Sequence, residues 1–66
     1  MMRGVLTPRQ TEVLVMISGG KPWKALVDEL RISPMTLKSH LHSVRERLGA
    51  QNTTHAVAIA IKRGLI

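Results

Sequence analysis

Hydrophobic residues recur along the chain at the three- and four-residue spacing of helices, and there is no alternating strand pattern of useful length. Spacing and flanking signals predict four helices near residues 7–19, 22–31, 33–49 and 53–63. The apolar stripes of the first three are Val13, Leu14 and Ile17, then Leu26, Val27 and Leu30, then Leu37, Leu41, Val44 and Leu48. The predicted fold class is therefore all-α, a compact four-helix bundle.

Capping signals mark where the predicted helices begin. We expect the Thr7 side chain to cap the first helix, with Gln10 at the capping-box spacing and a proline at the first helical position. Ser33-Pro34 repeats the signal for the third helix. The second start is weaker, because the residues before it offer no capping oxygen. The fourth helix is expected to be capped by Thr53 or Thr54.

The connection between the second and third helices is short. Glycines are expected to end the other helices, at Gly19-Gly20, Gly49 and Gly64. About three residues, however, join Leu30 to Pro34. So short a link forces the two helix axes to cross. The arrangement predicted is a helix-turn-helix, whose second helix can enter a DNA major groove.

The third helix combines its apolar stripe with a polar outer face. That face holds Met35, Lys38, Ser39, His42, Arg45 and Glu46. Lysine and arginine side chains can donate to guanine edges, and the positive helix N-terminus suits a phosphate, since the one carboxylate lies near the other end. The alternative is a face that is merely solvated, as on any surface helix.

Three further residues lie at the edge between the two faces, namely Thr36, His40 and Arg47. We expect His40 to be structural, packing its ring and bonding a neighbouring helix. Arg47 is positioned to pair with Glu12. A metal site is not expected, because His40 and His42 face different ways, His55 stands alone, and cysteine is absent.

The fourth helix is apolar almost all round, whereas a helix at the edge of a small domain needs only one apolar stripe. Its second apolar side is expected to cover a partner, because wide exposed apolar patches usually mark contacts. The predicted dimer interface consists of Val57, Ala58, Ile59 and Ile61. The alternative is that the whole stripe wraps into one small core.

Composition narrows the functional class. The 66 residues allow one domain, here 1–66 with 1–5 as a short N-terminal extension, and the net charge of +6 favours nucleic acid first and a membrane surface second. With Trp23 the only aromatic residue, base-stacking on single strands is disfavoured. No apolar run is long enough to span a membrane, and Met1 to Val5 is too short for a signal peptide, so a cytoplasmic protein is expected.

Catalytic chemistry is not expected. The chain has no paired carboxylates, no Ser-His-Asp set and no glycine-rich phosphate loop, and a deep pocket would take material that so small a core needs. We therefore expect no enzymatic activity, no cofactor and no small-molecule ligand.

Four motifs in the right order resemble the LuxR-type (GerE-like) DNA-binding domain. Residues 6–14, LTPRQTEVL, are similar to its opening L-T-P-R-E-x-E-V-L. Residues 32–40, ISPMTLKSH, are similar to its recognition stretch I-S-x-x-T-V-K-x-H. Gly20-Lys21 followed by Lys24 matches its second helix, and residues 47–57 match its close. The resemblance covers Leu6 to the end, with Gln10 in place of a common glutamate and Trp23 in place of a small polar residue.

The resemblance implies a transcription regulator that binds double-stranded DNA, usually as a dimer through its fourth helix. The base-reading residues expected on the outer face are Lys38, Ser39, His42 and Arg45. The phosphate-contacting residues expected are Lys24, Ser33, Thr36 and Gln51. Such a protein is expected at the nucleoid.

Two questions stay open at this point. Most members of that family carry a sensor domain ahead of this one, so the chain is either a stand-alone regulator or an excised domain; Met1-Met2 and Ile66 favour the first. The alternative function is a small interaction protein that pairs with a LuxR-type regulator and antagonises it. Such an antagonist has no need of Lys38 and Arg45.

Overall fold

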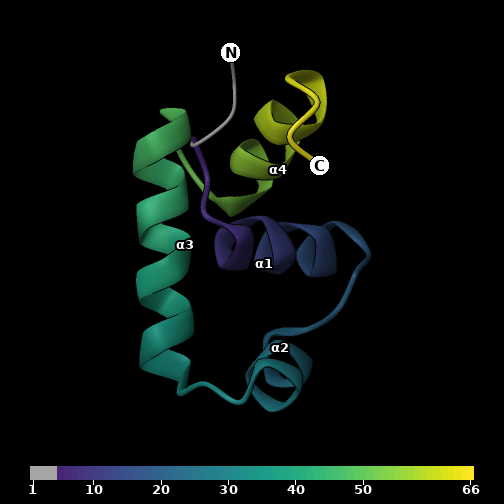
Figure 1. Ribbon diagram of the computed structural model, residues 1–66, viewed down its shortest axis with the longest axis vertical. Coiled ribbons are helices and arrows are strands. Elements are labelled where there is room, and N and C mark those ends of the chain that lie inside the picture. Colours follow the sequence, from purple (N-terminus) through teal and green to yellow (C-terminus); the bar gives the residue numbers. More distant parts are fainter. Residues whose placement is uncertain (1–4) are drawn as a thin grey trace.

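The computed structural model describes residues 5–66, which form four helices: α1 (Pro8–Ser18), α2 (Trp23–Leu30), α3 (Pro34–Leu48) and α4 (Thr53–Lys62) (Figure 1). No strand occurs within these described residues. Every helix end lies within one residue of its predicted position. The all-α prediction is thus confirmed. The extension predicted at 1–5 falls outside the described residues except for Val5.

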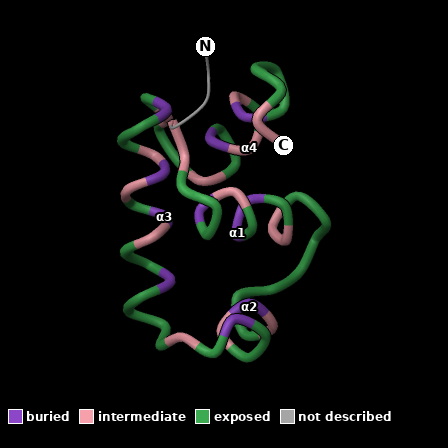
Figure 2. Tube along the Cα trace, viewed as in Figure 1, coloured by how far each residue is buried: buried purple, intermediate pink, exposed green. Residues whose placement is uncertain are grey.

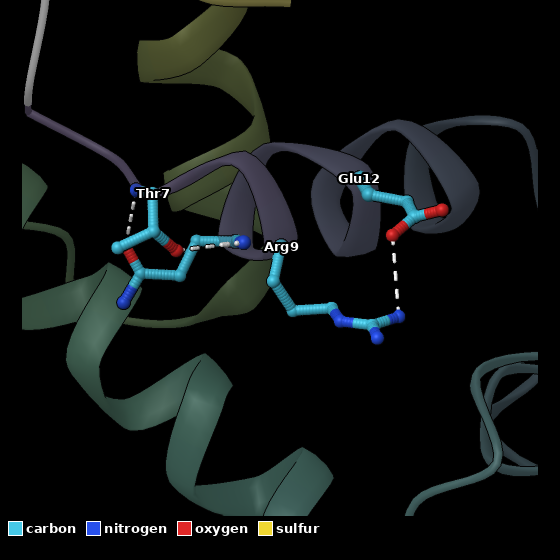
Figure 3. Close-up of polar contacts among 4 residues, drawn as sticks. Thr7, Arg9 and Glu12 are labelled. Carbon is cyan, nitrogen blue, oxygen red and sulfur yellow. Dashed lines mark hydrogen bonds and ion pairs between the residues drawn. The ribbon is translucent and has the colours of Figure 1, made fainter.

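The predicted caps of α1 and α3 are present. The Gln10 backbone N–H donates to Thr7 Oγ1 at 3.1 Å, and the Thr7 N–H donates to Gln10 Oε1 at 2.9 Å, which completes the capping box (Figure 3). Ser33 Oγ accepts from the Thr36 N–H at 3.0 Å. Helix α2 follows Pro22 without any side-chain cap, as predicted. The first turns of α1 and α3 are therefore held by local hydrogen bonds.

Asn52, rather than Thr53 or Thr54, caps α4, so that prediction is wrong. The Asn52 carboxamide oxygen accepts from the His55 N–H at 2.8 Å, while Thr53 is already the first helical residue. The Gln51 N–H also donates to His55 Nδ1 at 3.0 Å. Residues 51 and 52, in the turn before α4, are thus both hydrogen-bonded to His55. These bonds favour a helix that begins at Thr53, with Asn52 as its cap.

The α2–α3 connection is the predicted helix-turn-helix turn. Residues 31–33 link the helices, and Arg31 takes a left-handed conformation (φ 55°, ψ 47°) while its N–H bonds back to the Val27 carbonyl. Figure 1 shows α2 nearly end-on while α3 runs vertically, so the two axes cross steeply. The turn leaves α3 projecting along one side of the molecule.

The core is divided into two clusters rather than one. The first joins α1, α2 and α3 through Val13, Leu26, Leu30, Leu37 and Leu41. The second joins α1, α3 and α4 through Leu14, Val44, Leu48, Ala56 and Ala60. The first two described residues, Val5 and Leu6, and the last two, Leu65 and Ile66, also pack on the second cluster. Figure 2 shows that buried positions recur along the whole length of α3, so this one helix contributes to both clusters.

A buried side-chain bond joins α1 to α3. Gln10, only 5% exposed, donates from Nε2 to Ser43 Oγ at 3.0 Å across 33 residues of sequence. Because the Gln10 carboxamide also completes the capping box, it connects the start of α1 to the middle of α3. A glutamine at the third helical position is the only local sign of this contact in the sequence.

The expected pair between Arg47 and Glu12 does not form. Glu12 instead accepts from Arg9 Nη1 at 3.3 Å, one turn earlier on the same helix (Figure 3). Arg47 donates to the carbonyl oxygen of Val5 at 3.1 Å. The guanidinium therefore holds Val5 against α3, while the Glu12 carboxylate is engaged by Arg9 on its own helix.

Candidate nucleic-acid interface

The side of α3 that faces away from both core clusters presents the predicted base-reading residues together. Lys38, Ser39 and His42 are exposed and Arg45 is half-buried. At ~100° per residue, Ser39 and His42 lie across the helix from the stripe of Leu37 to Leu48, and Lys38 and Arg45 lie along one flank of that stripe. From position 38 to 45 this face extends about 10 Å along the helix axis, at ~1.5 Å per residue. A major groove ~12 Å wide accepts a helix carrying such a face.

The two permanently charged side chains of this face, Lys38 and Arg45, are available to an outside partner. Within residues 5–66, neither Lys38 nor Arg45 forms an ion pair. His42 Nε2 lies 3.4 Å from Glu46 Oε1, with both side chains largely exposed. So exposed a contact contributes little to stability and is easily exchanged for another partner. The face can therefore accept an external anion or a base edge.

The N-terminus of α3 carries two predicted phosphate contacts side by side. Ser33 Oγ and Thr36 Oγ1 are 2.9 Å apart, and both residues are exposed. One hydroxyl hydrogen is used between them, so the other is available to an outside acceptor. The first turn of α3 contains no acidic residue, and its backbone N–H groups add positive potential. This end of α3 is suited to a phosphate.

The remaining two predicted phosphate contacts lie on other elements. Lys24 is exposed in the first turn of α2, a helix without a capping side chain, and has no ion pair within the described residues. Gln51 is exposed in the turn after α3, at the end opposite Thr36. The structure brings Ser33 and Thr36 together and places Gln51 beyond the other end of the predicted base-reading face. Contacts so distributed suit a helix flanked by phosphates at both ends.

Acidic residues of the described chain lie mostly off this face. Glu29 accepts from Lys21 Nζ through both carboxylate oxygens at 2.7 Å, and Glu12 pairs with Arg9. These pairs neutralise cations of α1 and of the loop before α2. Positive charge consequently remains on α3, where Glu46 is the sole carboxylate. No group of three residues able to hold a metal ion occurs among residues 5–66.

The apolar surface of α4 is divided between the core and the exterior. Ala56 and Ala60 are fully buried, and Val57 and Ile59 are half-buried against the second cluster. Ala58 and Ile61 point outward, Ile61 with 56% of its surface exposed. Part of the surplus that suggested a partner is therefore intramolecular. The predicted dimer surface is reduced to Ala58 and Ile61, with the outer edges of Val57 and Ile59.

Sequence reasoning did not single out two residues of consequence at this site. Ser43 fixes α3 to α1 through Gln10, but a serine between Leu41 and Val44 gives no local sign of its partner. Met35 was placed on the outer face without a role, and its side chain is 80% exposed.

No helix of the described residues has the length and apolarity to cross a bilayer.

Known proteins resemble this chain over nearly all of its length. The profile of the family described as bacterial regulatory proteins, luxR family, matches residues 4–60. The chain is 43% identical over 61 residues to the transcriptional activator protein BjaR1 of Bradyrhizobium diazoefficiens. The matched stretch covers 92% of this chain and 25% of that protein. This chain is also 39% identical over 61 residues to the transcriptional regulatory protein YdfI of Bacillus subtilis. That match covers 92% of this chain and 29% of YdfI. The chain therefore spans between a quarter and a third of the length of these relatives.

Proposed function

We propose that this chain, which belongs to the luxR family of bacterial regulatory proteins, is a sequence-specific DNA-binding regulator of transcription whose α3 reads the major groove. The observation that carries this proposal is the face of α3. It presents Lys38, Ser39, His42 and Arg45 on one side, with both fixed cations unpaired within residues 5–66. The protein acts by binding, at the bacterial nucleoid in the cytoplasm, without a cofactor.

The residues of the face divide into two roles. Lys38 and Arg45 donate to guanine edges, while Ser39 and His42 complete the hydrogen bonding to neighbouring bases. Phosphates are contacted by Lys24, Ser33, Thr36 and Gln51. Of these four, only Lys24 is charged and neutralises a phosphate, so it should contribute ~0.9 to the slope with which log affinity falls as log salt rises. The base contacts then supply preference, and the phosphate contacts supply register.

Dimerisation through α4 is part of the proposal. The exposed Ala58 and Ile61 form its centre, with Val57 and Ile59 at its edges. Two copies on DNA would read half-sites about one helical turn apart. Their α4 helices would then pack against each other and bury their exposed apolar side chains. The same exposed pair also supports the alternative function, an antagonist that pairs with another regulator of this family. The donors on α3 favour DNA binding as the primary role.

A titration of duplex DNA with single variants tests the proposal. Duplexes are first selected from a random pool, and affinity is then measured on the selected and a scrambled duplex at two salt concentrations. Lys38→Ala should lose about 1–3 kcal/mol on the selected duplex, if its contact is to a base. Lys24→Ala should lose similar affinity on both duplexes and flatten the salt slope by ~1.

Lys62→Ala is the matched control, because it removes the same charge from an exposed position on α4. It should leave the difference between the two duplexes unchanged. An affinity that Lys38→Ala leaves unaltered on both duplexes would overturn the assignment of the reading face. Ile61→Glu should abolish cooperative binding to a duplex with two half-sites. If it binds that duplex as cooperatively as the unaltered chain does, α4 is not the dimer surface.

A further inference from the structure

Met35 is an apolar side chain in the middle of a polar face. It is the second residue of α3 and is 80% exposed, more than any other exposed large hydrophobic residue of the described chain. Ser39 and His42 follow it by four and seven residues, so all three share one side of the helix. A thioether thus stands directly beside the hydrogen-bonding groups of the proposed reading face.

Folding does not account for this placement. Met35 belongs to neither core cluster and is not among the half-buried residues that pack against them. The other exposed large hydrophobics, Val15, Trp23 and Ile61, lie on α1, α2 and α4. Met35 is therefore the one large apolar side chain that the reading face of α3 offers within residues 5–66.

The edges of base pairs in the major groove present one apolar group, the 5-methyl of thymine, beside their donors and acceptors. A methionine side chain is flexible and polarisable, so it can fill the space around such a methyl group. The N-terminal residues of a recognition helix are those that approach base edges. The exposure, position and chemistry of Met35 agree with this single target.

We propose that Met35 packs on the 5-methyl group of a thymine and is a specificity-determining residue of this protein, an inference that rests on the proposed DNA-binding function. Met35 and Lys38 are separated by about 4.5 Å along the helix axis, at ~1.5 Å per residue. Successive base pairs are ~3.4 Å apart along the duplex. The thymine therefore lies within one or two base pairs of the guanine that Lys38 reads.

Replacement of thymine by deoxyuridine tests the contact, because it removes the methyl group and leaves every hydrogen-bonding atom. Each thymine of the selected duplex is replaced in turn, and affinity is measured for the unaltered chain and for Met35→Ala. At one position the unaltered chain should lose about fourfold in affinity, the typical effect of one buried methyl-sized group. Met35→Ala should lose about the same on the thymine duplex, and the deoxyuridine replacement should then cost it nothing more.

Val15→Ala is the matched control, since it truncates an exposed apolar side chain on α1. It should keep the full thymine preference of the unaltered chain. Circular dichroism should show all variants folded, because both truncated side chains are exposed. A deoxyuridine effect of equal size in Met35→Ala, or no effect at any thymine in the unaltered chain, overturns the inference.

The same measurements separate this inference from the proposed function. If the unaltered chain prefers the selected duplex and Lys38→Ala abolishes that preference, the reading face stands whatever the methyl test gives. A missing methyl effect then refutes only the role of Met35. If no duplex is preferred over a scrambled one, both the proposed function and the thymine contact are refuted.

Discussion

Removal of the Gln10–Ser43 bond should reveal how strongly α3 is fixed to α1. Ser43→Ala leaves the Gln10 carboxamide N–H, in a side chain only 5% exposed, without its acceptor. A buried donor left unpaired costs about 1–3 kcal/mol. For a chain of 66 residues the whole unfolding free energy is roughly 3–10 kcal/mol, at ~0.05–0.15 kcal/mol per residue. The loss is therefore a large share of the total.

The second single variant, Gln10→Met, keeps the length of the side chain but removes both of its hydrogen bonds. Ser43 is half-buried and can turn to water, and the N–H of the exposed Thr7 can do the same. Two net hydrogen bonds at about 0.5–1.5 kcal/mol each predict a loss of ~1–3 kcal/mol, reduced by the apolar burial of the methionine. The double variant, Ser43→Ala with Gln10→Met, contains neither the Gln10 carboxamide nor the Ser43 hydroxyl, so neither is left unpaired. Its loss of unfolding free energy should therefore be smaller than the sum of the losses in the two single variants.

Urea and thermal denaturation of all four proteins, followed by circular dichroism, measure this cycle. We expect a coupling energy of about 1 kcal/mol or more between the two positions, above the ~0.3–0.5 kcal/mol within which independent sites add. The thermal midpoint of Ser43→Ala should fall by about 4–8 °C for each kcal/mol lost. Losses that simply add in the double variant would mean that the two side chains do not share a buried bond.

Three further predictions concern the core, a cap and the reading face. Leu41→Ala, at a side chain 2% exposed in the first cluster, should cost ~2–5 kcal/mol and leave much of the chain unfolded by circular dichroism at room temperature; a melt like that of the unaltered chain would contradict the core assignment. Asn52→Ala should cost about 0.5–2 kcal/mol in urea melts and Thr53→Ala clearly less, because only Asn52 caps α4; the reverse order would restore a threonine as the cap. Glu46→Gln should tighten binding to selected and scrambled DNA alike, by roughly 0.2–1 kcal/mol and less at high salt, since it removes the one carboxylate of α3; an effect confined to one duplex would instead place Glu46 at a base.

The sequence alone determined what depends on neighbours within one helical turn. The capping box of Thr7 and Gln10, the cap at Ser33 and the left-handed stop at Gly49 each use groups no more than four residues apart. The outer face of α3 was equally predictable, because helical periodicity separates Lys38 from the buried stripe without reference to any other helix. Only the cap of α4 was misplaced, where Asn52 and the two threonines after it compete for the same role.

Tertiary structure decided which partner each face meets. Periodicity puts Val13 and Leu14 side by side on the apolar part of α1, yet packing sends Val13 to the α2 side and Leu14 to the α4 side. The partner of Arg47 lies 42 residues away, at the carbonyl of Val5, and that of Gln10 lies 33 residues away, at Ser43. A helical period specifies the direction of a side chain about its own axis. Which atoms lie in that direction depends on how the helices cross, and the crossing arises from the packing of all four together.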